Sequence, residues 1–171
     1  MNLDFASVWE TIADIVPEND ALICGDEVVS WKDYDLNSSK IATALLNAGL
    51  SANSKAGLYL NNSNEYLIAQ NAIFKIGGVP INVNYRYMAE ELIYLLDNSD
   101  SEAVFYHACY SGRIKEIASS LPNIKAWIEI PDGTKSEFHD SLIFTELLNS
   151  CKPMERIYSC LLYTSDAADE W

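Results

Sequence analysis

The chain has 171 residues, of which 49% are hydrophobic and 21% are charged. This mixture is typical of a globular domain with a core and excludes disorder throughout. The formal net charge is -14, with only 11 lysines and arginines, which argues against nucleic-acid binding because neutralising phosphates requires a basic surplus. No window approaches the roughly 18 apolar residues of a membrane-spanning helix. The N-terminus lacks the basic start and uninterrupted apolar centre of a signal peptide, so we expect a cytoplasmic protein without a transmembrane segment.

The first fifty residues predict a helix, a hairpin and a second helix. Apolar residues recur at helical spacing from Phe5 to Val16, and Pro17 marks the end of the helix. Two β-prone runs flank Gly25-Asp26, a dipeptide typical of a hairpin turn. Ser30 is placed to cap the next helix, which is expected to stop at a glycine, Gly49.

Strands and helices then alternate with short connections. The segments KAGLYLN, VPINVN, EAVFYH and KAWIEI predict four strands. Amphipathic segments between them predict helices, the first of which can begin after Ser63 and end at Gly77-Gly78. This alternation is typical of a parallel sheet covered by helices. The sequence therefore predicts an α/β fold, a mostly parallel sheet with helices on both faces, preceded by an N-terminal helix and a β-hairpin.

The polar segments that follow the four strands are candidates for a binding site. They read NNSNE, NYRY, HACYSGR and PDG. In open α/β sheets, ligands collect beyond the carboxyl ends of the strands. We therefore expect these segments to meet at one edge of the sheet.

The residues alone predict no catalytic group and no metal site. The motifs G-x-G-x-x-G, G-x-x-x-x-G-K-[ST], G-x-S-x-G and H-E-x-x-H do not occur. None of the four cysteines lies in a C-x-x-C pair, and reduced thiols are expected at Cys24, Cys109, Cys151 and Cys160. His107 and Cys109 could face a metal together, but no other closely spaced ligand accompanies them. A buried pair at the end of a strand is the preferred interpretation.

Several motifs, in order and at matching spacing, resemble the N-terminal region of adenylate-forming (AMP-binding) enzymes. The stretches that carry the resemblance are ALICGDEVVSWKDYDLNSSKIATALLNAGL, residues 21–50, and residues 56–107. Within the second stretch, residues 64–66 hold the E-Y end of an N-x-x-E-Y helix. Residues 74–86 resemble an F-K-x-G-A-V-P-V-N-x-N-Y-R strand, and residues 91–99 resemble an E-L-x-Y-L-L-x-D-S helix. These motifs are most similar to those of fatty-acyl-CoA synthetases of the bacterial type, and the resemblance covers roughly residues 5–158.

The resemblance implies an ATP-dependent acid–thiol ligase that uses ATP, Mg²⁺ and coenzyme A. Such enzymes activate a carboxylic acid, here a fatty acid, as an acyl-adenylate and transfer the acyl group to coenzyme A. The family's phosphate loop would follow residues 155–159, where this sequence departs from the pattern. We therefore expect a truncated fragment that lacks the catalytic motifs, shows no ligase activity alone and binds the cofactors poorly. Its main partner would be the missing C-terminal part of the same chain.

By the same resemblance, three residues lie near the nucleotide end of coenzyme A. They are Tyr85 and Arg86, after the second strand of the alternating region, and Arg113, after the third. Arginine suits phosphate because it is always charged and donates two hydrogen bonds side by side. The alternative is structural: Arg86 anchors the following helix or pairs with Glu90.

The end of the sequence predicts a boundary between residues 159 and 160. Residues 160–170, CLLYTSDAADE, match the in-frame translation of a transposase-end sequencing adapter. We expect 1–159 to be a partial N-terminal domain and 160–171 to be a non-native tail; a natural acidic tail is the alternative. Independently assembled genomic sequence running through codon 171 would contradict the adapter interpretation.

Two other functions stay open. Another adenylate-forming enzyme, such as a peptide-synthetase adenylation domain or a luciferase-like oxygenase, would share these motifs. A non-catalytic α/β binding module is the third possibility, and it requires the chain to fold stably by itself. Cooperative, monomeric unfolding would support the module, whereas aggregation or molten behaviour would favour the truncation. Because a parallel sheet buries both faces, we expect the missing chain to supply some of the cover, which disfavours the module.

Overall fold

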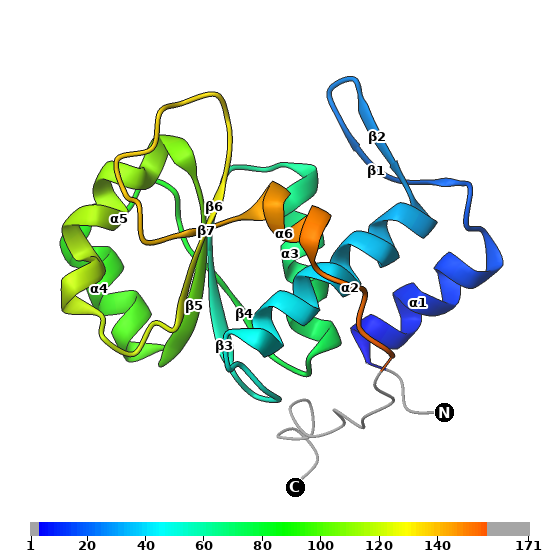
Figure 1. Ribbon diagram of the computed structural model, residues 1–171, viewed down its shortest axis with the longest axis horizontal. Helices are drawn as coiled ribbons and strands as arrows, with labels where there is room; N and C mark the ends of the chain where they lie inside the picture. The colour runs from blue at the N-terminus through cyan, green and yellow to red at the C-terminus, as the bar shows by residue number, and fades with distance from the viewer. Residues whose placement is uncertain (1–3, 157–171) are drawn as a thin grey trace, which may run out of the picture.

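The computed structural model describes residues 4–156, so the predicted boundary at 159/160 and the tail 160–171 lie outside the described residues. The chain forms an open sheet between two layers of helices, with a separate hairpin (Figure 1). The helices are Phe5–Ile15 (α1), Trp31–Asn47 (α2), Asn64–Lys75 (α3), Ala89–Asn98 (α4), Ser111–Ile117 (α5) and Phe144–Ser150 (α6), with short 3₁₀ turns at Ala108–Tyr110 (η1) and Ala118–Ser120 (η2). The strands are Asp20–Cys24 (β1), Glu27–Ser30 (β2), Lys55–Tyr59 (β3), Val79–Asn82 (β4), Ser101–His107 (β5), Ala126–Ile130 (β6) and Leu142–Ile143 (β7).

The central sheet has five strands in the order β4-β3-β5-β6-β7, and every pair is parallel. The strands β1 and β2 form a separate antiparallel hairpin around Gly25-Asp26. The predicted α/β architecture, with its N-terminal helix and hairpin, is therefore confirmed. No helix within residues 4–156 is long and apolar enough to cross a membrane.

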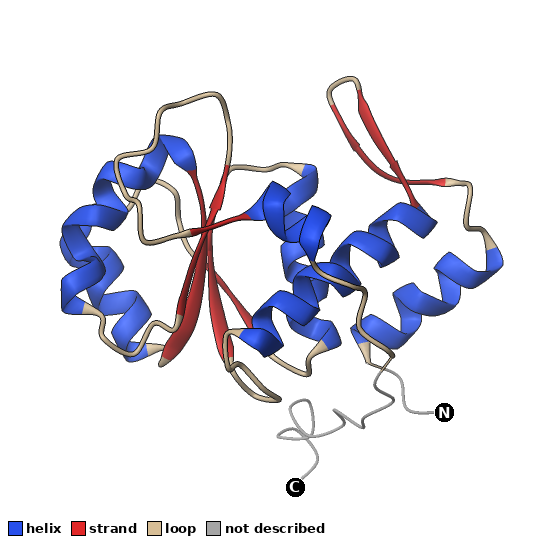
Figure 2. Cartoon of the chain, in the orientation of Figure 1, coloured by secondary structure: helices blue, strands red, loops and turns tan. Residues whose placement is uncertain are grey.

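Helices from within the chain cover both faces of the sheet (Figure 2). Phe105 on β5 packs toward α2 and α3, in a core cluster that also contains Ile41 and Ile73. Its neighbour on the strand, Tyr106, packs toward α4 and α5 in a second cluster. Because successive strand residues face opposite sides, β5 and β6 are buried along almost their whole length.

Helices α2 and α3 begin at the predicted serine caps, and α3 ends at the predicted glycine pair. The Ser30 hydroxyl accepts a hydrogen bond from the Asp33 N–H (3.1 Å), and Ser63 does the same for Tyr66 (3.3 Å). After α3, Gly77 adopts a φ of 70°, a left-handed conformation that glycine tolerates without strain. The Gly77 and Gly78 N–H groups bond back to the last turn of α3, so the glycine pair is the predicted helix stop.

Two elements at the C-terminal end were not predicted. The fifth strand, β7, has two residues, paired with β6 at Ile128 and Glu129. Helix α6 follows directly and places the buried ring of Phe144 against Phe105. A two-residue strand gives no alternation to recognise, and α6 has no side-chain cap, so neither had a signal in the sequence.

A cluster of charged side chains joins α1, α2, α3 and the last described residues; we call it the charge cluster. Lys75 has only 2% of its side chain exposed, and its Nζ lies 2.5 Å from Glu10 Oε1 and 2.6 Å from Asp35 Oδ1. Arg156 adds two bonds to Asp14 (2.6 and 2.9 Å) and one to Asp35 (3.3 Å). The Arg156 guanidinium lowers the pKa of the Asp14 carboxyl. The cluster thus ties residues 151–156 to the first two helices.

Candidate functional site

The four polar segments meet at the carboxyl edge, by which we mean the edge of the sheet where β3, β4, β5 and β6 end. Tyr110 on η1 donates a hydrogen bond to the Asn61 side chain after β3 (2.8 Å). The Cys109 N–H donates to Asp132 after β6 (3.0 Å). Tyr59 at the end of β3 reaches the loop after β4. The predicted gathering of these segments is therefore present in the fold.

Tyr59 is the centre of the contacts that hold the loop between β4 and α4. Its side chain is fully buried, and its hydroxyl lies 3.2 Å from the carbonyl oxygens of both Tyr85 and Tyr87. Burial raises the pKa of Tyr59, although the Arg113 guanidinium opposes the shift. The hydroxyl therefore keeps its proton and donates it to one of these carbonyls.

Arg113 on α5 holds the same loop from the other side. Its Nη1 donates to the Tyr59 hydroxyl and to the Tyr87 carbonyl (2.9 Å), with a longer contact to the Tyr85 carbonyl (3.5 Å). Its guanidinium also lies 6.0 Å from the centre of the Tyr110 ring. Arg113 is only partly exposed, and its Nη1 group already donates to backbone carbonyls of the loop.

Arg86 and Tyr85 form the exposed tip of this loop. The Arg86 guanidinium lies 5.5 Å from the centre of the Tyr85 ring, a distance typical of a cation–π contact. The turn is fixed from below by a hydrogen bond from the Arg86 N–H to the Asn84 side chain (3.0 Å). Between residues 4 and 156 no carboxylate forms an ion pair with Arg86, so the pairing with Glu90 is not present.

The structure brings the three predicted site residues together, with different roles. Tyr85 and Arg113 meet through the Tyr85 carbonyl, and Arg86 lies over the Tyr85 ring. Only Arg86 presents a cation to solvent, whereas Arg113 positions the loop. Tyr59 was missed, although a tyrosine at the end of a buried strand is a usable signal because its hydroxyl needs a partner.

Beside this loop, His107 closes the end of β5. Its Nδ1 accepts a hydrogen bond from the Asn61 N–H (3.2 Å), so the proton of the neutral ring is on Nε2. Burial lowers the pKa of His107, against the opposing charges of Asp132 and Glu65. A neutral ring is what the Asn61 contact requires, and His107 therefore links two segments of the carboxyl edge.

The interpretation of His107 and Cys109 as a buried pair is half wrong. His107 is buried, but Cys109 is exposed, because it lies on η1, beyond the end of the strand. Among the described residues, no group of three or more His, Cys, Asp or Glu side chains is placed to hold a metal ion.

We expect Cys109 to react slowly with alkylating reagents in spite of its exposure. Partial burial and the hydrogen-bonded Asp132 carboxylate raise the pKa of the Cys109 thiol to about 11. Because only the thiolate attacks, alkylation by iodoacetamide at pH 8 should be roughly tenfold slower than for cysteine in an unstructured peptide. Its rate should keep rising up to about pH 11, as peptide mass spectrometry can measure. Asp132→Asn should accelerate it at pH 8, and a variant rate equal to that of the parent chain would contradict this explanation.

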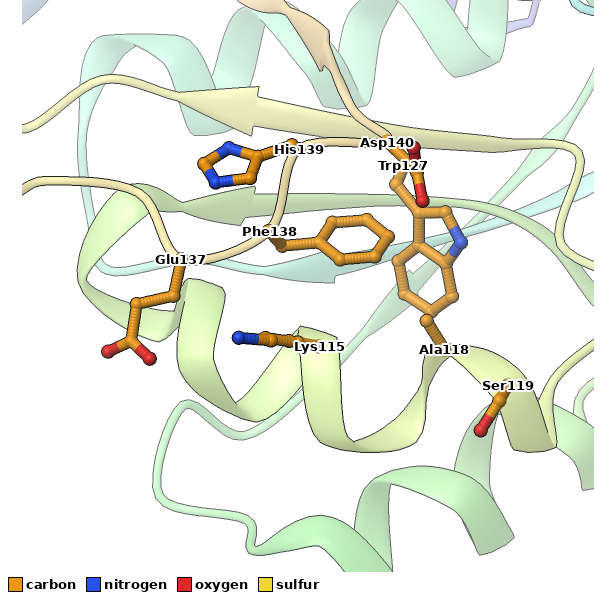
Figure 3. A pocket seen from close by; sticks show the side chains of 8 residues that line it. All are labelled: Lys115, Ala118, Ser119, Trp127, Glu137, Phe138, His139 and Asp140. Atoms are coloured by element: carbon orange, nitrogen blue, oxygen red, sulfur yellow. The ribbon is translucent and has the colours of Figure 1, made fainter.

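A separate hollow of about 590 Å³ lies between α5, β6 and the loop before β7 (Figure 3). The rings of Phe138 and Trp127 form its apolar part, and its charged lining residues are Lys115, Glu137 and Asp140. None of the predicted site residues lines it. Its charged groups have opposite signs and its edge is open, so it offers no arrangement typical of acid–base or nucleophilic catalysis.

Comparisons with known proteins agree with the fold and the predicted family. The AMP-binding enzyme family matches residues 9–165. The medium/long-chain-fatty-acid--CoA/3-oxocholest-4-en-26-oate--CoA ligase of Mycobacterium marinum (strain ATCC BAA-535 / M) is 36% identical over 136 residues, which cover 80% of this chain and 25% of that protein. The 3-oxocholest-4-en-26-oate--CoA ligase of Rhodococcus rhodochrous is 35% identical over 138 residues, 81% of this chain and 25% of that protein.

A solved structure shows the same fold at lower identity. The Mycobacterium tuberculosis fatty acyl CoA synthetase superposes with a TM-score of 0.77 at 22% identity, over 91% of this chain and 30% of that one. The chain thus spans about a quarter of the length of the curated relatives it matches. Since the family match covers most of its residues, the chain belongs to the AMP-binding enzyme family.

Proposed function

We propose that the chain is the N-terminal part of an ATP-dependent acyl-CoA synthetase that activates a fatty acid as its adenylate and transfers it to coenzyme A. The observation that carries this proposal is the family match over residues 9–165. It is supported by two relatives named as CoA ligases, of which the chain spans 25%. On the sequence argument alone, we propose a cytoplasmic location.

Within this function, the described residues would not supply the adenylation chemistry. When bound, ATP and Mg²⁺ would provide the leaving group and stabilise the phosphoryl charge. Residues 4–156 contain no glycine-rich phosphate loop and no cluster of carboxylates fit for a metal. We propose that these groups belong to the rest of the polypeptide and that the isolated chain binds ATP and Mg²⁺ poorly.

We propose that the carboxyl edge contributes to the coenzyme A site instead. Arg86 would contact a phosphate of the nucleotide end, and Tyr85 would lie beside it at the exposed tip of the loop. Arg113 and Tyr59 would act through the loop backbone, because their polar groups bond to the Tyr85 and Tyr87 carbonyls. The absence of an ion pair on Arg86 within residues 4–156 supports this role, since its charge is available to an anion.

In the enzyme encoded by the intact gene, Arg86→Ala should raise the KM for coenzyme A by about tenfold, the loss of one charge-assisted phosphate contact. Adenylation, measured as ATP–pyrophosphate exchange, should be largely kept. Lys32→Ala is the matched control, because Lys32 is an exposed cation on α2 whose partner is Glu18. An Arg86 variant with an unchanged KM for coenzyme A would remove Arg86 from the site.

We also propose that residues 160–171 are an adapter-derived tail. The family match extends to residue 165, so the match by itself does not separate native from adapter-derived residues. Sequencing the source DNA across codons 155–171 separates them. A glycine- and threonine-rich phosphate loop within about ten codons of residue 159 is the result we expect.

A further inference from the structure

The β1–β2 hairpin carries apolar side chains on both of its faces. Leu22 and Val29 point toward the core, where Leu22 is buried and Val29 packs against it. Ile23 and Val28 lie on the opposite face, 66% and 55% exposed, and are direct partners across the two strands. A hairpin with one face in water normally has polar residues on that face. We call the face with Ile23 and Val28 the outer face.

The rest of the described chain leaves this outer face uncovered. The hairpin projects away from the sheet, with the helices below it (Figure 1), and its inner face contacts the core through Leu22 and Val29. The contacts that hold it come from α2 and α3. A two-stranded hairpin is marginally stable by itself in water, so the apolar pair on its outer face indicates a missing partner.

The charges around the hairpin argue against a second copy of this chain as that partner. Asp20, Asp26 and Glu27 lie on its strands and turn, and residues 17–31 contain no lysine or arginine. Two hairpins packed against each other would bring these acidic groups together. The partner surface should therefore have an apolar centre with basic residues around it.

The length and path of the polypeptide favour a partner from the same chain. The curated relatives extend to about four times the matched length. The last described residues lie against α1 and α2, where the Met154 N–H bonds to the Ser39 carbonyl (3.2 Å) and Arg156 bonds to Asp14. The chain therefore leaves the described part in the helical layer from which the hairpin projects.

We propose that the outer face of the hairpin is the docking surface for the part of the same polypeptide that follows the described residues. The contact is an apolar patch centred on Ile23 and Val28, with lysine or arginine side chains of the downstream part facing Asp26 and Glu27. This inference rests on the proposed function only in taking the chain as the first part of a longer enzyme.

Hydrogen exchange tests the docking without any need for ligase activity. Amide exchange in residues 20–30 is measured by mass spectrometry in the 171-residue chain and in the intact gene product. Exchange in the hairpin should be at least about tenfold slower in the intact product, because docking suppresses the local opening that permits exchange. Ile23→Ser combined with Val28→Ser should abolish most of this slowing and lower the Tm of the intact product only. Tyr94→Ser, at a 71% exposed position on α4, is the control and should change neither.

Equal exchange of the hairpin in both proteins would overturn the docking. So would a slowing that also occurs in the 171-residue chain, grows with its concentration and accompanies a dimer in sedimentation velocity, because the partner would then be a second copy. An intact product with a protected hairpin but no thioester formation would support the docking and contradict the proposed function. An active enzyme with an unprotected hairpin would overturn the docking alone.

Discussion

Replacing Lys75 with methionine should lower the free energy of unfolding by about 3–5 kcal/mol, the loss typical of breaking a buried ion pair from one side. Lys75 is the cation at the centre of the charge cluster, with Glu10 at 2.5 Å and Asp35 at 2.6 Å. Methionine keeps much of the side-chain volume but leaves Glu10 buried without that partner. Glu10 keeps Arg156 Nε at 3.7 Å, so the loss comes from a poorly compensated buried carboxylate and only to a small extent from packing.

Urea unfolding of the 171-residue chain, followed by circular dichroism, measures this loss. Lys55→Met is the matched control, since Lys55 Nζ pairs at 3.0 Å with Asp100, which is almost fully exposed. An exposed pair contributes about 0–1 kcal/mol. Adding Glu10→Gln and Asp35→Asn to Lys75→Met should recover part of the loss, because the carboxylates that have lost Lys75 are then neutral. Equal losses for Lys75→Met and Lys55→Met would show that the cluster is not electrostatically important.

The sequence predicted the order of elements in residues 5–130 because each level of structure gives a signal there. Buried parallel strands are continuous apolar runs, and Ser30, Ser63, Gly49 and Gly77 mark helix ends. The cover of the sheet was judged less well. Helices of the described chain cover both faces of the central strands β5 and β6, so the downstream chain is not required there. Cover is incomplete at the edge strands β4 and β7 and on the hairpin.

The candidate site could be predicted only as a neighbourhood. The rule that carboxyl ends of parallel strands share an edge placed the segments NYRY and HACYSGR side by side. The resemblance to the family then singled out Tyr85, Arg86 and Arg113 within them. It could not show that Arg113 is engaged by the loop backbone while Arg86 is not, because that depends on which side chains reach which carbonyls. The buried ion pairs of Lys75 could not be predicted for a related reason. Its partners Glu10 and Asp35 lie 65 and 40 positions away, beyond any local spacing rule.

Gly78, the second glycine of the pair that ends α3, has no room for a side chain. Gly78→Ala should lower the free energy of unfolding by about 3 kcal/mol, at the upper end of the usual loss from overpacking. A Cβ at this position would lie 2.8 Å from the Ser54 carbonyl oxygen, 3.0 Å from Ile73 Cγ2 and 3.1 Å from the Ile73 carbonyl oxygen. Two of these three atoms belong to the backbone. They also accept the hydrogen bonds of Gly78 N–H (2.8 Å) and Val79 N–H (2.9 Å), so a shift that relieves the contact weakens the start of β4.

Gly112→Ala provides the comparison, measured in the same urea experiment. Gly112 lies in α5, and an added Cβ would meet the Glu137 carboxylate at 3.3 Å, the end of an exposed side chain that can move. Alanine also favours the helix by about 1 kcal/mol over glycine. Gly112→Ala should therefore leave the stability unchanged or raise it slightly. If Gly78→Ala unfolds at the same urea midpoint as the parent chain, the close contacts at Gly78 do not limit the stability.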